Sequence, residues 1–138
     1  MIKTYSLLAL AVLALAGCSG EPAPASTPTS PPVAQSYASV VELKDAAVAA
    51  GYDCPNWVQS NRITLAASSG ECSTRDTFAV YLTEQDVSTA VQKHKSFGKS
   101  FGTEVSLLVG PNWIINSKPA TGLGTLREGM GGMLVAQA

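Results

Sequence analysis

Apolar residues from position 39 onward recur at spacings that predict three helices. Spacings of three, four and seven place side chains on one face of a helix. Apolar residues with these spacings occur in residues 40–50, 84–95 and 120–130. Ser39 and Glu42 form the pair of a capping box before the first helix, and Gly51 follows its last turn. Thr83 is the expected N-cap of the second helix, and Pro119 suits the first turn of the third.

Four shorter segments predict β-strands, because they are apolar or alternate apolar with polar residues. They are residues 63–67, 77–82, 104–109 and 113–116. Gly110, Pro111 and Asn112 predict a tight turn between the last two strands. We expect residues 97–102 to form a loop or a frayed helix end, and residues 133–135 to form either a short last strand or a fraying tail.

The predicted order is helix, strand, strand, helix, strand, strand, helix. Short connections between consecutive strands favour hairpins and therefore an antiparallel sheet. We predict an α+β fold, a small antiparallel sheet of about four strands with helices packed on one face. Residues 37–138 are long enough for one such domain, because domains usually contain about 100 to 150 residues.

The N-terminus has a different pattern, that of a secretory signal peptide. Lys3 precedes an unbroken apolar run over residues 7–16. The run is too short for a stable transmembrane helix, which needs about 20 apolar residues. We therefore expect residues 1–17 to be removed.

The apolar run ends in Leu15-Ala16-Gly17-Cys18, which resembles the lipobox of bacterial lipoproteins. In that family the cysteine sulfur receives a diacylglyceryl group, and the chain is cut just before this cysteine. The resemblance implies a lipid on Cys18 that attaches the protein to the extracytoplasmic face of the cell membrane. Two or more acyl chains would hold it there, since each buried methylene contributes about 0.8 kcal/mol. An ordinary secretory signal followed by an incidental cysteine is the alternative.

Residues 18–36 are the expected anchor and tether. After Cys18 this segment is rich in Pro, Ser, Thr and Ala and has almost no large apolar side chains. Such a composition cannot bury enough surface to offset the entropy lost on ordering. It predicts a disordered tether that extends up to about 3.1 Å per residue where it is polyproline-like. The chain as a whole, with a lipid anchor, a tether and a small domain, resembles small bacterial and prophage lipoproteins of unassigned activity in its size and layout.

The chain has three cysteines. If Cys18 takes the lipid, Cys54 and Cys72 remain as one disulfide pair in an oxidising compartment. The bond would close a loop of about 19 residues and stabilise the domain by roughly 3 kcal/mol. A metal site is disfavoured, because two cysteines and the distant His94 lack the paired spacing of zinc ligands. We expect neither a metal nor a cofactor.

Charge and composition bear on the partner. The net charge of −1 disfavours nucleic acid, which calls for a basic surface. One local cluster could still bind anionic headgroups or wall polymers. It consists of Lys93, Lys95, Phe97, Lys99 and Phe101. A solvated helix face is the alternative interpretation.

Catalysis is the competing class of function. His94 is the only histidine, and no nucleophile motif surrounds the nearby Ser96 or Ser100. We therefore predict that the protein is not an enzyme. A small cell-envelope hydrolase is the alternative, and a pocket holding His94 with a carboxylate and a hydroxyl would favour it.

The sequence therefore predicts a lipid-anchored extracytoplasmic lipoprotein whose small domain binds an unknown protein or envelope partner at the cell surface. Some phage lipoproteins block injection by a second phage, so by that analogy superinfection exclusion is an alternative. A structural envelope component that needs no ligand is another.

Overall fold

The computed structural model describes residues 30–118 and 120–137. The predicted signal peptide, Cys18, most of the tether and Pro119 lie outside the described residues. Within the described part the elements are α1 (Val40–Ala49), β1 (Ser68–Ser73), β2 (Asp76–Val80), α2 (Glu84–Phe101), β3 (Val105–Val109), β4 (Trp113–Asn116), α3 (Thr121–Met130) and β5 (Met133–Gln137). The predicted order is confirmed, with one strand added after α3.

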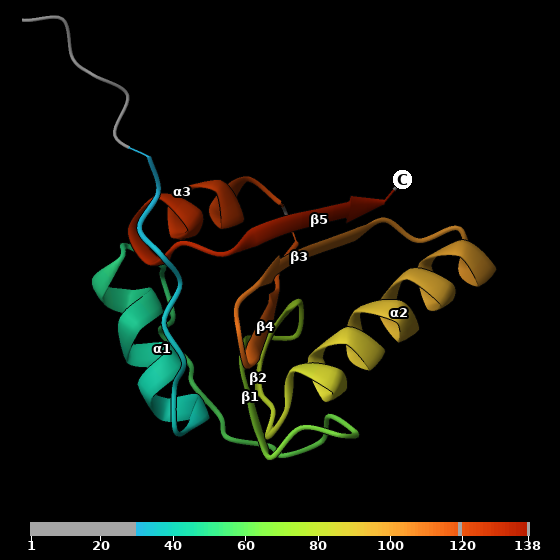
Figure 1. The fold of residues 1–138 in the computed structure, drawn as a ribbon, viewed down its shortest axis with the longest axis horizontal. Helices are drawn as coiled ribbons and strands as arrows, with labels where there is room; N and C mark the ends of the chain where they lie inside the picture. Colours follow the sequence, from blue (N-terminus) through green and yellow to red (C-terminus); the bar gives the residue numbers. More distant parts are fainter. Residues whose placement is uncertain (1–29, 119, 138) are drawn as a thin grey trace, which may run out of the picture.

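The described strands form one five-stranded sheet in the order β1-β2-β4-β3-β5 (Figure 1). All four strand pairs are antiparallel, so the predicted α+β class is confirmed. The sheet has five strands instead of about four, because β5 pairs along the whole of β3 from Val105↔Gln137 to Val109↔Met133. Gly131 and Gly132 make this return possible with φ values of 74° and 95°, which glycine adopts without a steric penalty.

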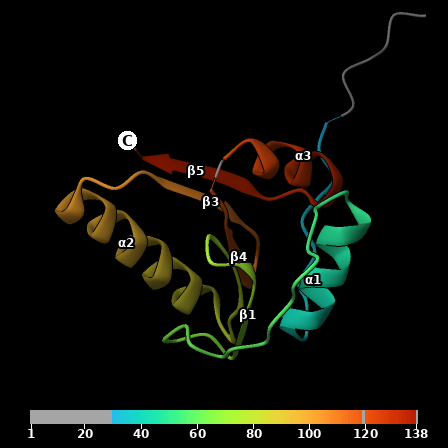
Figure 2. The same ribbon diagram turned by 180° about the vertical axis from the view of Figure 1, so that it is seen from behind.

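Helices cover both faces of the sheet, so the prediction of one covered face is wrong. In Figures 1 and 2, α1 and α3 lie on one side of the sheet and α2 on the other. The neighbouring residues Phe78 and Ala79 contribute to two different hydrophobic clusters, and so do Ile115 and Ile114. Successive side chains of a strand point to opposite faces. Because both faces of the central strands are apolar, both have to be buried.

The expected strand at residues 63–67 is also wrong. That segment forms a turn in which Leu65 has φ 75°, and β1 begins at Ser68. Two contacts explain why small and polar residues, not apolar ones, form this edge strand. Gly70 lies against the ring of Trp57, where a Cβ atom would overlap the ring. Ser69 is buried, and its hydroxyl accepts a hydrogen bond of 3.2 Å from the Ile63 amide.

The predicted start signals of the first two helices are confirmed. The Ser39 hydroxyl accepts from the Glu42 amide at 3.2 Å, and the Glu42 carboxylate accepts from the Ala38 amide at 3.0 Å. The Thr83 hydroxyl accepts from the Asp86 amide at 3.1 Å at the start of α2.

The second helix is longer than predicted, because residues 97–101 belong to α2 and are not a loop. Gly98 is buried against Val105 at the start of β3, and a Cβ atom there would overlap that side chain. The glycine thus lets the helix continue close to the sheet. Gly102 ends α2 in the left-handed conformation with φ 59°.

The Cys54–Cys72 disulfide forms as predicted and joins two cysteines 18 positions apart. Cys72 is buried in the cluster beneath α1 and α3. Replacing both cysteines with alanine should therefore lower the free energy of unfolding by about 3 kcal/mol, because the unfolded chain regains its loop entropy. Denaturant titration measures this loss. Native protein treated with dithiothreitol is the control and should match the double variant, whereas an unchanged unfolding midpoint would contradict the expectation.

Candidate functional site

A cleft of about 660 Å³ lies beside α2. Four parts of the chain line it: the turn that begins at Arg62, Tyr81 after β2, the inner side of α2 from Ala90 onward, and the neighbouring ends of β3 and β4. Its apolar lining includes Ile63, Ala90 and Val105. The volume falls in the usual range for small-molecule sites, about 300 to 1,000 Å³.

His94 lies half-buried in this cleft on the inner side of α2. Burial lowers the pKa of its imidazole below the ordinary value of 6.5, so the ring is neutral at pH 7. Glu104 and hydroxyl groups including that of Thr103 line the same cleft. Among the described residues, however, no hydrogen bond joins His94 to another side chain. The cleft brings together the groups of a hydrolytic site without connecting them.

Tyr81 contributes the most unusual group of the cleft. The residue follows β2 and is 2% exposed. Its hydroxyl is the one buried side-chain oxygen or nitrogen in the described residues that has no hydrogen-bond partner. Burial, and next the Asp86 carboxylate, raise the pKa of this hydroxyl to about 12, so it keeps its proton and can donate. Sequence reasoning missed Tyr81, because an aromatic residue at the end of an apolar strand signals only a core position.

The predicted basic and aromatic residues lie on two sides of α2. Phe97 and Phe101 are 58% and 69% exposed, and their ring centroids are 4.5 Å apart. Lys93 precedes Phe97 by one helical turn, so it lies on the same side of the helix. We call Lys93, Phe97 and Phe101 the aromatic stripe; Lys93 and Phe97 also line the cleft. Lys95 and Lys99 are about 120° to 160° around the helix from Lys93 and Phe97, so the structure does not bring them into this stripe.

Comparison with known proteins does not assign a function to this cleft. The chain matches no protein-family model, and no curated protein or solved structure is significantly similar to it. In residues 30–118 and 120–137, no helix is long and apolar enough to cross a membrane. The same residues contain no group of three or more His, Cys, Asp or Glu side chains placed to hold a metal ion. The function has to be argued from the side chains themselves.

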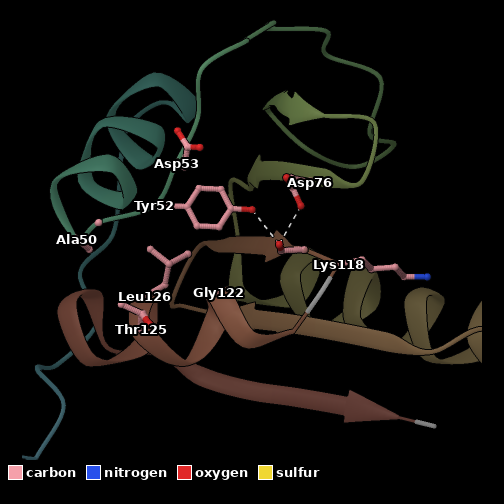
Figure 3. A pocket seen from close by; sticks show the side chains of 10 residues that line it. Ala50, Tyr52, Asp53, Asp76, Lys118, Gly122, Thr125 and Leu126 are labelled. Carbon is pink, nitrogen blue, oxygen red and sulfur yellow. Dashed lines mark hydrogen bonds between the residues drawn. The ribbon is translucent and has the colours of Figure 1, made fainter.

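A second pocket of about 320 Å³ lies between the end of α1 and the start of α3 (Figure 3). The Tyr52 hydroxyl and the Ser117 hydroxyl are 2.8 Å apart, and Ser117 donates to Asp76 at 2.8 Å. Burial raises the pKa of Tyr52 to about 12, and the Asp76 carboxylate adds to the increase. Because Ser117 is 3% exposed and its proton is already donated, this chain of hydrogen bonds is suited to holding β2, β4 and α1 together.

The segment before α1 is attached on the side of the sheet opposite the cleft. The Trp113 indole donates to the Gln35 carbonyl at 2.8 Å. The Asn112 side chain accepts from the Tyr37 amide at 3.0 Å and donates to the Tyr37 carbonyl at 2.8 Å. Ala34 and Tyr37 pack against the cluster beneath α1 and α3. In Figures 1 and 2 this segment passes α1 and α3, and α2 lies across the sheet from it.

The environment of His94 predicts a pH-dependent stability. The folded pKa lies below 6.5 and the unfolded pKa near it, so the folded state binds fewer protons in this range. The free energy of unfolding should be highest above pH 6.5 and fall as the pH drops through the folded pKa. Proton NMR titration of the single histidine gives the folded pKa directly. Replacing His94 with glutamine should flatten the stability profile in this window, and a folded pKa at or above 6.5 would contradict the prediction.

Proposed function

We propose that the protein is a lipid-anchored extracytoplasmic lipoprotein whose domain binds a partner at the cell surface through the α2 side. The lipobox-like Leu15-Ala16-Gly17-Cys18 supports the anchor. The position of α2 across the sheet from the N-terminal segment supports the binding role. A domain held through its N-terminus would present the cleft and the aromatic stripe away from the point where the tether joins.

The observation that carries the binding proposal is the exposure of Phe97 and Phe101. Two phenylalanines that are more than half exposed and lie against each other are an apolar surface that water does not favour. Exposed apolar groups that gather in one place, with charge beside them, are typical of interaction sites. Lys93 adds a positive charge to the stripe, which suits an anionic partner such as a phosphate-bearing polymer or headgroup.

A small hydrolase is the second candidate, favoured by the presence of His94, Glu104 and hydroxyl groups in one cleft. It ranks lower, because a general base needs its nucleophile within hydrogen-bond reach. Ester hydrolysis by the purified protein that disappears in His94→Gln would reverse this order.

The anchor predicts a specific product in a bacterium that processes lipoproteins. The mature chain should begin at Cys18, have the added mass of a diacylglyceryl group and sediment with membranes. Cys18→Ala should have neither the added mass nor the membrane association, since it lacks the sulfur that receives the lipid. Intact-mass spectrometry and membrane fractionation measure both properties. Cleavage at another position with a soluble product would contradict the proposal.

The aromatic stripe predicts where a partner is captured in living cells. A photo-crosslinking amino acid at position 101 should give discrete adducts. The same group at Val48 is the control and should give none: Val48 is also exposed, at 47%, but it lies on α1, across the sheet from the aromatic stripe. Lys93→Gln should reduce the adduct yield at low salt, and Lys95→Gln is the matched control on the other side of α2. Equal adducts from positions 48 and 101, or equal effects of the two lysine variants, would contradict the assignment.

A further inference from the structure

The Tyr81 hydroxyl is a buried hydrogen-bond donor in the wall of the cleft beside α2, and it has no partner among the described residues. A buried hydroxyl without a hydrogen bond is unfavourable, and phenylalanine would fill the same space without that cost. Other buried polar side chains named above have partners, such as Ser117 with Asp76 and Ser69 with the Ile63 amide. Asp86, the acid that acts on Tyr81, already accepts from the Thr83 hydroxyl at 2.7 Å. The Tyr81 proton is therefore not donated to any other described side chain or backbone group, and Tyr81 lines the cleft.

The charges around the cleft define what could enter it. Arg62, Lys93 and Lys118 line it, and Glu104 is the one carboxylate among its lining residues. His94 is neutral at pH 7, because its pKa is lowered, and adds no charge there. The cleft thus has an excess of two positive charges although the whole chain has a net charge of −1. An anion is favoured over a neutral or cationic molecule of the same shape.

The remaining lining is apolar, which restricts the anion further. Ile63, Ala90 and Val105 provide hydrophobic surface, and Phe97 extends it to the edge of the cleft. A simple inorganic ion would leave this surface and most of the 660 Å³ unused. A molecule with an apolar body and an acidic group would contact both kinds of lining.

We infer that the cleft binds a small amphipathic organic anion. Its acidic group lies among Arg62, Lys93 and Lys118, its apolar body contacts Ile63 and Val105, and an acceptor atom receives the hydrogen bond of Tyr81. This site shares Lys93 and Phe97 with the aromatic stripe, but binding there requires neither the lipid nor a cellular partner.

The chain contains its own reporter for this site, because His94 is its single histidine and lines the cleft. The full-length protein, purified without a histidine tag in a non-ionic detergent, is titrated with 4-hydroxybenzoate while the His94 ring protons are followed by NMR. The probe has an aromatic body, a carboxylate and a phenolic acceptor. We expect saturable shifts with a dissociation constant in the millimolar range, as befits a fragment of this size. 4-Hydroxybenzamide, which lacks the charge, should bind at least threefold more weakly.

Two variants separate the contributions of hydrogen bond and charge. Tyr81→Phe should weaken 4-hydroxybenzoate binding by roughly three- to tenfold and leave benzoate, which lacks the phenolic acceptor, unaffected. The free variant should unfold at the same or a higher denaturant concentration, because the buried hydroxyl is gone. Arg62→Gln should weaken binding of both anions, whereas Arg127→Gln, an equal loss of charge at an exposed site on α3, should not.

Three results would overturn the inference. One is the absence of any His94 shift with 4-hydroxybenzoate up to its solubility limit. Another is equal binding of the acid and the amide. The third is a Tyr81→Phe variant that unfolds more easily yet binds the probe with unchanged affinity, since Tyr81 would then be purely structural. Each result is independent of the lipid analysis and of crosslinking in cells.

Discussion

The complete burial of Trp113 is the constraint on which the rest of the domain depends. The side chain is 0% exposed, and its indole nitrogen donates to the Gln35 carbonyl at 2.8 Å. A Cβ atom at Gly110 would overlap the indole ring, so the turn between β3 and β4 must have glycine there. Gly132, before β5, also lies beside the ring. One buried aromatic residue therefore fixes the central hairpin, the start of the last strand and the segment that enters the domain.

Two tyrosines on opposite faces of the sheet, Tyr52 and Tyr81, differ in their hydrogen bonding. Burial is the largest cause of the raised pKa, about 12, of both Tyr52 and Tyr81. The Tyr52 hydroxyl is hydrogen-bonded to Ser117, as a stable core requires, while the Tyr81 hydroxyl has no partner in the described structure. The tyrosine hydroxyl is thus hydrogen-bonded at Tyr52, which helps to hold the fold together, and has no hydrogen bond at Tyr81, which lines the larger cleft. Buried polar groups in folded proteins are nearly always hydrogen-bonded, so the unpaired Tyr81 hydroxyl is an exception that calls for a specific explanation.

Much of the fold could be predicted from the sequence, because helix starts depend on residues only a few positions apart. Ser39 and Thr83 cap helices through bonds to amides three residues away, and these were predicted correctly. The edge strand was missed because its polar residues are held by distant partners, Trp57 against Gly70 among them. Tyr81 was missed for a related reason: its missing hydrogen bond is a property of the surroundings that the fold brings together. Helical periodicity alone is enough to place Lys95 and Lys93 on nearly opposite sides of α2, because the two residues are two positions apart in the sequence.

One side of α2 packs on the sheet, and its last turns also carry two exposed aromatic residues. Val87, Ala90 and Gly98 are buried and His94 is half-buried, so the inner side of α2 covers the sheet along most of the helix. The last turns continue because Gly98 can approach Val105 closely, and they leave Phe97 and Phe101 more than half exposed. Stability alone favours burying or omitting such side chains. Their exposure next to a cationic cleft, across the sheet from the attached N-terminal segment, supports the proposal of a domain that binds on one side and is tethered on the other.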